Sequence, residues 1–105
     1  MAKKLLFTFF LLFSIAGFSQ KTIVKLSAAP NPFRSATNIK FESKKKQPVF
    51  LTIKNVLGKT VFKKVYQTQP GKNRIRFNRN NLKAGMYIYC IQSNKETVSK
   101  RFVIR

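Results

Sequence analysis

Residues 49–54 read VFLTIK, and the alternation in this stretch decides the fold class of the chain. Val49, Leu51 and Ile53 share one parity, whereas positions 50, 52 and 54 hold Phe, Thr and Lys. A period of two places successive side chains on opposite faces of an extended chain, which is typical of a half-buried β-strand. We therefore predict a strand here, with its aliphatic face toward a core.

Short segments on both sides repeat this extended pattern and are separated by turn sequences such as Gln69-Pro70-Gly71-Lys72 and Asn94-Lys95. In residues 60–67 the apolar side chains occupy both parities, which predicts a twist or a bulge. No segment between the strands has helical length or period. The pattern indicates an all-β fold, a small immunoglobulin-like antiparallel β-sandwich of about seven strands. The further strands are predicted over residues 23–28, 36–42, 60–67, 73–78, 86–93 and 96–104.

Parity also predicts which side chains face the core in the later strands. Ile75 and Phe77 are expected to point inward, and the arginines beside them outward. Tyr87 is expected to enter the core, with its hydroxyl group bonded to a backbone group. Tyr89 and Ile91 share that parity, whereas Cys90 falls on the other face.

The first part of the chain has the layout of a secretory signal peptide. Two lysines precede an apolar run over residues 5–17, and that run is shorter than the roughly 20 residues of a membrane span. Gly17 and Ser19 then supply the small residues of a cleavage site. We predict a signal peptide over residues 1–19 and a mature domain over residues 20–105 without a membrane span. The alternatives are a buried core helix and an uncleaved anchor.

The composition is strongly basic, with 22 Lys and Arg residues against 2 acidic residues and a formal net charge of +20. Such charge predicts a soluble monomer with a solvated surface. It also leaves open a module that binds anionic glycans, lipopolysaccharide or lipid headgroups. Export away from the cytoplasm argues against nucleic acid as the partner, with extracellular DNA as the weaker alternative.

Residue types that carry catalysis or bind metals are scarce. The chain has no histidine, and Cys90, Glu42 and Glu96 cannot by themselves form a metal cluster or an activated nucleophile. We therefore predict no catalytic residue, no cofactor and no metal site. Both glutamates are expected in surface ion pairs with lysines. Cys90 has no intramolecular disulfide partner and is expected to be an unreactive thiol, with pairing between molecules as the alternative.

Three aromatic residues, Phe50, Phe62 and Tyr66, stand near basic residues and could stack on bases or sugar rings. A two-sheet sandwich is expected to bury most of them instead. Residues 28–33, AAPNPF, form a rigid segment because each proline fixes φ and favours extended geometry in the residue before it. Phe33 is expected to close one end of the core.

Six short motifs occur along the chain in a characteristic order, and together they resemble the type A C-terminal sorting domain of the type IX secretion system of Bacteroidota. The resemblance covers about 80 residues of the sequence. The motifs are Pro30-Asn31-Pro32-Phe33, Thr37-Asn38-Ile39-Lys40-Phe41, residues 51–61 (LTIKNVLGKTV), Pro70-Gly71-Lys72-Asn73, Leu82-Lys83-Ala84-Gly85-Met86-Tyr87 and Lys100-Arg101-Phe102-Val103-Ile104.

The resemblance implies targeting without catalysis. Domains of this family fold in the periplasm, an outer-membrane translocon recognises them, and attached cargo is carried out. A sortase-like peptidase removes the domain, and cargo can be joined to anionic lipopolysaccharide. The resemblance thus implies export through the inner membrane to the periplasm, and then to the cell surface or medium. The residues that it implies for sorting recognition are Pro30, Asn31, Pro32, Phe33, Gly85, Tyr87, Lys100, Arg101 and Arg105.

Only residues 20–28 separate the predicted cleavage site from the first motif, so we expect a free-standing sorting domain without a cargo domain. The alternative is a basic cell-surface module for anionic glycan or lipopolysaccharide.

Overall fold

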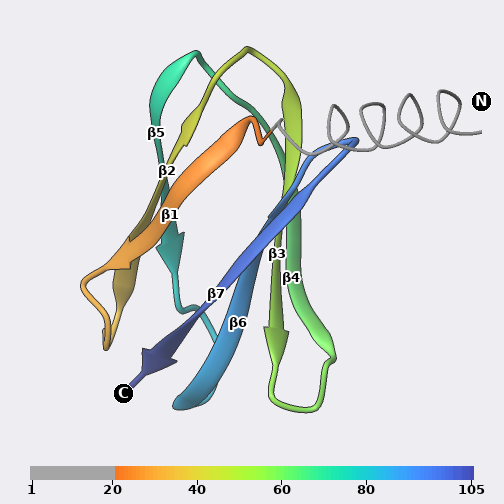
Figure 1. Cartoon of the computed structure of the whole chain (residues 1–105). Coiled ribbons are helices and arrows are strands. Elements are labelled where there is room, and N and C mark those ends of the chain that lie inside the picture. The colour runs from red at the N-terminus through yellow and green to blue at the C-terminus, as the bar shows by residue number, and fades with distance from the viewer. Residues whose placement is uncertain (1–20) are drawn as a thin grey trace, which may run out of the picture.

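The computed structural model describes residues 21–105, which form seven strands (Figure 1). The predicted signal peptide lies outside the described residues. Within residues 21–105 no helix is long and apolar enough to cross a membrane. The strands are β1 (Ile23–Ala29), β2 (Ala36–Ser43), β3 (Pro48–Asn55), β4 (Thr60–Gln67), β5 (Gly71–Asn78), β6 (Gly85–Gln92) and β7 (Thr97–Ile104).

The strands form two antiparallel sheets that pack face to face. The three-stranded sheet has the order β1-β2-β5, and the four-stranded sheet has the order β4-β3-β6-β7. In Figure 1 the two sheets stand as separate layers, and the chain crosses between them after β2 and again after β4 and β5. This architecture confirms the predicted all-β sandwich of seven strands.

The core lies between the sheets and draws on every strand except β4, whose apolar residues pack against its margin. Ile75, Phe77, Tyr87, Tyr89 and Ile91 are all buried, so the predicted inward parities are confirmed. The alternating strands bring one apolar face of each sheet together, which removes that surface from water. The buried apolar residues are Ile23, Leu26, Phe33, Ile39, Phe41, Val49, Leu51, Ile53, Ile75, Phe77, Tyr87, Tyr89, Ile91, Phe102 and Ile104.

Two register shifts interrupt the regular pairing of the strands. In β1 the pairing with β2 shifts register between Val24 and Ser27, and Lys25 has a φ of 58°. The bulge turns Leu26 inward after Ile23, so the inward parity changes within the strand. A second shift lies between Ile53 and Lys54 in the pairing of β3 with β4, which confirms the irregularity predicted for residues 60–67.

The three aromatic residues considered for stacking differ in burial. Phe62 and Tyr66 are partly buried against the core, and the Phe62 ring meets Phe77 edge to face at 5.2 Å between centroids. Phe50 is 41% exposed, and the Lys63 ammonium group lies 4.7 Å from its ring centroid. The sandwich thus covers two of these rings and leaves the third on its outer surface.

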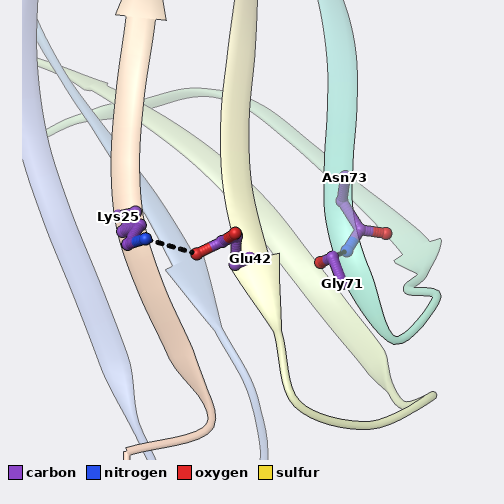
Figure 2. A network of polar contacts seen from close by, with 4 residues as sticks. All are labelled: Lys25, Glu42, Gly71 and Asn73. Carbon is purple, nitrogen blue, oxygen red and sulfur yellow. Dashed lines mark hydrogen bonds and ion pairs between the residues drawn. The ribbon is translucent and has the colours of Figure 1, made fainter.

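The two glutamates play different roles. Glu42 and Lys25 form an ion pair of 3.2 Å between Oε2 and Nζ across β2 and β1 (Figure 2), as predicted. The expectation of an ion pair for Glu96 is corrected. Its carboxylate instead accepts hydrogen bonds from the Thr22 and Ile23 amides, at 2.9 and 2.7 Å, and from the Thr22 hydroxyl group. Glu96 therefore fixes the start of β1.

Candidate functional site

The end of β7 pairs with the proline motif along its outer edge. The Phe33 amide donates to the Val103 carbonyl at 3.0 Å, and the Arg105 amide donates to the Phe33 carbonyl at 2.8 Å. Phe33 and Ile104 thus form a parallel bridge. The motif adds a short fifth segment to the four-stranded sheet at the position where β7 would otherwise present a free edge.

The side chain of Asn31 extends this pairing. Its Nδ2 donates to the Arg101 carbonyl at 3.2 Å, and its Oδ1 accepts from the Val103 amide at 3.0 Å. An amide side chain presents an N–H donor beside a carbonyl acceptor, as a peptide group does, so Asn31 takes the place of a strand residue. Pro30 and Pro32 flank it, exposed, each after a cis peptide bond.

The Gly85 to Tyr87 corner pairs with the opposite edge of the same β7 segment. Gly85 is level with Ile104, and Tyr87 is level with Phe102. The Tyr87 hydroxyl group donates to the Lys83 carbonyl at 2.7 Å, which confirms the predicted backbone partner. The last residues of β7 are therefore held on both sides, by β6 and by the proline motif.

An aromatic cluster in the core packs beneath β7, β6 and the proline motif and fixes their positions. Phe33 is buried, and its ring meets Phe102 edge to face at 5.0 Å between centroids and Phe77 at 6.4 Å. Tyr89 stacks on Phe102 at 5.1 Å. Edge-to-face and stacked pairs add to the stabilisation from burial. Phe33 closes this end of the core, as predicted.

The basic residues of the last strand lie at this end but do not form one cluster. Lys100, Arg101 and Arg105 are exposed, whereas Phe102 and Ile104 between them are buried. Successive strand residues point to opposite faces, so Lys100 and Arg101 point away from each other. The structure therefore brings the three predicted motifs together through the backbone, and it separates their charges.

Arg79 is a further residue at this end that sequence reasoning missed. Its Nε donates to the Leu82 carbonyl at 2.8 Å, and its Nη1 donates to the carbonyl groups of Arg34 and Arg105. The guanidinium group thus ties the β5–β6 connection to the β1–β2 connection and to the residue that follows β7. An arginine among three asparagines in a loop carries no sequence signal of this role, because the three carbonyl groups meet only in the fold.

The basic side chains of the described residues are spread over all sides of the domain. Five of them border or cover the outer face of the three-stranded sheet, and all of these except Arg76 line a shallow hollow of about 550 Å³. Others lie on the opposite sheet and in the connections at both ends. This distribution fits a solvated basic surface more closely than a single patch for polyanions. The five are Lys25, Lys40, Lys72, Arg74 and Arg76.

Cys90 lies half-buried on the outer face of the four-stranded sheet, level with Thr52 and Ser99. Burial raises the pKa of its thiol, and the nearby charge of Lys54 lowers it by a smaller amount. A raised pKa keeps the thiol protonated and weakly nucleophilic. Within residues 21–105 no three His, Cys, Asp or Glu side chains are grouped to hold a metal ion.

The comparisons with known proteins agree with this geometry. The family model described as "Secretion system C-terminal sorting domain" matches residues 27–105. Among solved structures, dimeric latent PorU from Porphyromonas gingivalis is similar, with a TM-score of 0.65 at 16% identity. The similarity covers 84% of this chain but 10% of PorU, so it supports the fold alone. No curated protein matches the sequence.

The family match spans β2 to β7, the last three residues of β1 and all three motifs that meet at the end of β7. It covers well over half of the chain. The chain therefore belongs to the secretion-system C-terminal sorting domains, the sorting tails of the type IX secretion system.

Proposed function

We propose that the outer-membrane machinery of type IX secretion recognises this domain by the end of the sandwich where residues 30–33, 85–87 and 100–105 meet. The observation that carries the proposal is the two-sided pairing of β7, with Asn31 and Phe33 on one edge and Gly85 on the other. Segments about 70 residues apart thus form one surface. The recognised feature is a folded surface rather than a linear peptide.

The predicted recognition residues divide into two groups by their exposure. Phe33 and Tyr87 are buried, so they position the surface from inside without touching a partner. The exposed residues are available for direct contact, and a surface fixed by the β7 pairing loses little conformational entropy on binding. These contact residues are Pro30, Asn31, Pro32, Gly85, Lys100, Arg101 and Arg105.

The role is targeting and not catalysis. The sorting-tail family is not an enzyme family, and its members are directed to the cell surface or the medium. The signal peptide directs the chain through the inner membrane and is removed by a cut before Gln20, and the domain then folds in the periplasm. A sortase-like peptidase then acts on the amino-terminal side of Ile23. A cut ahead of Pro30 would instead sever β1, which is paired with β2 and carries the buried Leu26.

The test follows the full chain in a bacterium with a type IX secretion system and in a matched strain without its outer-membrane translocon. Mass spectrometry of periplasmic, membrane and medium fractions reports the location and the mature amino terminus. We expect export in the first strain and retention in the periplasm of the second. Equal distribution in both strains would contradict the proposal.

A pair of charge reversals localises the recognised surface. We name the end of the sandwich where residues 30–33, 85–87 and 100–105 meet the motif end. Lys100→Glu with Arg105→Glu changes exposed residues at the motif end, and Arg74→Glu with Arg76→Glu makes the same charge change on the three-stranded sheet. We expect the first pair to abolish most of the export and the second pair to leave it near the level of the unmodified chain. Thermal denaturation of both variants checks that each remains folded.

A further inference from the structure

Four exposed apolar residues lie at the motif end of the four-stranded sheet, and we name this group the end strip. Their exposed fractions are 69% for Val56, 89% for Leu57, 42% for Met86 and 38% for Val103. Met86 pairs directly with Val103 across β6 and β7. Asn55, the last residue of β3, pairs with Tyr87, and Val56 and Leu57 follow it in the turn to β4. In Figure 1 the β3–β4 connection, the start of β6 and the end of β7 lie at the same end of the molecule.

Positive charge borders the end strip. The next row of the same outer face holds Lys54, Ile88 and Arg101, which are paired across β3, β6 and β7. Ile88 in the centre is half-buried, and a cation stands on each side of it. The described acidic residues lie elsewhere, with Glu42 on the three-stranded sheet and Glu96 holding the start of β1. The border therefore carries uncompensated positive charge.

The end strip contrasts with the outer face of the other sheet. There three successive pairs of β2 and β5 are polar, with Asn38 opposite Arg76, Lys40 opposite Arg74, and Glu42 opposite Lys72. Polar side chains cover most of the surface of this domain, so four exposed aliphatic side chains at one end need an explanation. Exposed apolar residues that gather within a polar border are typical of interaction sites.

The turn that carries Val56 and Leu57 is held in one conformation. The Asn55 Oδ1 accepts hydrogen bonds from the Leu57 and Lys59 amides, each at 3.0 Å. The Gly58 amide donates to the Asn55 carbonyl at 3.0 Å, and Gly58 has a φ of +83°, which favours glycine. Turn tips usually carry polar residues. This one presents two aliphatic side chains on a rigid support.

We propose that the end strip is the docking surface for a protein partner that presents an apolar patch bordered by acidic side chains. The inference rests on the proposed function, since the strip adjoins the motif end and Arg101 belongs to both surfaces. The partner is then a component of the export machinery. Acidic groups opposite Lys54 and Arg101 would speed encounter and fix orientation, while the apolar patch covers the strip.

Two other occupants fit the arrangement less well. In a symmetric pair of copies, Lys54 and Arg101 of one molecule would approach the same cations of the other, which is repulsive. A lipid bilayer could take up the Leu57 tip. However, Met86 and Val103 project from the flat face of the sheet, where a bilayer that meets the tip would not cover them.

The first test replaces strip residues while keeping the strands intact. Leu57→Ser changes the tip, and Met86→Thr with Val103→Thr changes the flat part of the strip. Val65→Thr is the matched control, because Val65 is 54% exposed on the same outer face but opposite Phe50, away from the strip. We expect both strip variants to lose most of their export and the control to keep it, with melting temperatures near that of the unmodified chain. Full export of folded strip variants would overturn the docking inference and leave the proposed function standing.

A second comparison tests the charged border. Lys54→Glu with Arg101→Glu is expected to reduce export strongly, because it places like charges opposite the acidic border of the partner. Lys40→Glu with Arg74→Glu makes the same charge change on the other sheet and is expected to have little effect. Equal export of the two double variants would overturn the inference that the partner presents acidic side chains.

Direct contact is tested by photo-crosslinking in cells, with p-benzoylphenylalanine in place of Met86 or, as the control, Val65. An adduct at position 86 to an identified envelope protein, lost when acidic residues beside its apolar patch are neutralised, supports the inference even if export proves independent of the translocon. No protein adduct at position 86 overturns it. Two other results would also overturn it. Binding to phosphatidylglycerol vesicles that is abolished only by Leu57→Ser would indicate a lipid bilayer as the occupant. A dimer in light scattering that Met86→Thr dissociates would indicate a second copy of the chain.

Discussion

Asn31 shows how one side chain can complete a sheet. It lies outside the strands, yet its amide group bonds the Arg101 carbonyl and the Val103 amide as a neighbouring strand would. The two flanking prolines restrict the backbone that carries it. Asn31 thus links residues 30–33 to β7.

We expect Asn31→Ala to lower the free energy of unfolding by about 1 kcal/mol. The change removes two hydrogen bonds at an exposed position, where water partly replaces them. Chemical denaturation measures the difference. Asn94→Ala is the control, because Asn94 is also exposed and its side chain makes no hydrogen bond in the described part of the chain. Equal stability of the two variants would show that the bonds to β7 contribute nothing.

Glu96 is a second residue whose side chain joins distant parts of the chain, and its contribution to stability depends on pH. Burial raises the pKa of its carboxyl group, but the hydrogen bonds from Thr22 and Ile23 outweigh burial and leave the pKa below the ordinary value of 4.5. A lowered folded-state pKa means that the charged form stabilises the fold. That stabilisation is present above the ordinary value and is lost as the pH falls through the folded value.

The expected result is a melting temperature that falls in acid for the unmodified chain and less steeply for Glu96→Gln. At neutral pH, Glu96→Gln should melt at a lower temperature, and below pH 4.5 the two curves should converge. Calorimetry from neutral to acidic pH checks this. Glu42→Gln is the control, and a small change is expected because its partner Lys25 has a side chain that is 75% exposed.

At the scale of elements, β7 combines two roles in one strand. Phe102 and Ile104 are almost completely buried, while the residues between and before them are exposed at the motif end. Removing residues 100–105 would therefore remove core side chains and the partner of Phe33 together. Truncation of this strand cannot separate sorting from folding, whereas point substitutions of its exposed residues can.

We expect Phe102→Ala to lower the free energy of unfolding by about 3–5 kcal/mol, since it leaves a cavity beneath Phe33 and Tyr89. Phe102→Leu, which keeps most of the volume, should cost about half as much or less. Denaturant titration of the full chain measures both. A cost for Phe102→Ala below about 1 kcal/mol would contradict the central place of this ring in the core.

Much of the fold could be predicted from side-chain parity. The alternation around Leu51 and the burial of Tyr87 follow from a period of two, and the structure confirms both. The bulge at Lys25 was only a weak alternation in the sequence, because a bulge shifts the parity without leaving a marker residue. The family resemblance identified the domain, and the match over residues 27–105 confirms it.

The arrangement of the site was less predictable. The motifs at Asn31 and Gly85 could be read from the sequence, but their position on opposite edges of β7 could not, because register across about 70 residues is set by the whole sheet. The same holds for the end strip. Val56 and Met86 are unremarkable apolar residues in the sequence, and the pairing of β3 with β6 brings their segments to the same end of the sheet.

For the whole molecule, the excess of positive charge opposes compactness. The chain carries 22 basic residues against 2 acidic ones, and within residues 21–105 the bases are spread over all sides. Repulsion between them favours the expanded chain and keeps copies apart. Attraction between opposite charges contributes little, since the Lys25–Glu42 pair is exposed.

Salt should therefore stabilise the domain. Raising the ionic strength from about 0.01 M to about 0.5 M shortens the screening length from roughly 30 Å to below 10 Å and weakens the repulsion. We expect the melting temperature to rise with sodium chloride, while light scattering continues to report a monomer. A melting temperature that falls with salt would show that the few attractive pairs outweigh the repulsion.

The bridge between Phe33 and Ile104 joins segments that are synthesised at different times. During synthesis, residues 30–33 emerge well before residues 101–105, and they have no sheet edge to join until those last residues follow. A chain that is truncated before Phe102 lacks two core side chains, Phe102 and Ile104, and has no completed end surface. The surface proposed for recognition therefore comes into being only when translation has passed Arg105, and its presence reports that the chain up to that point has been made in full.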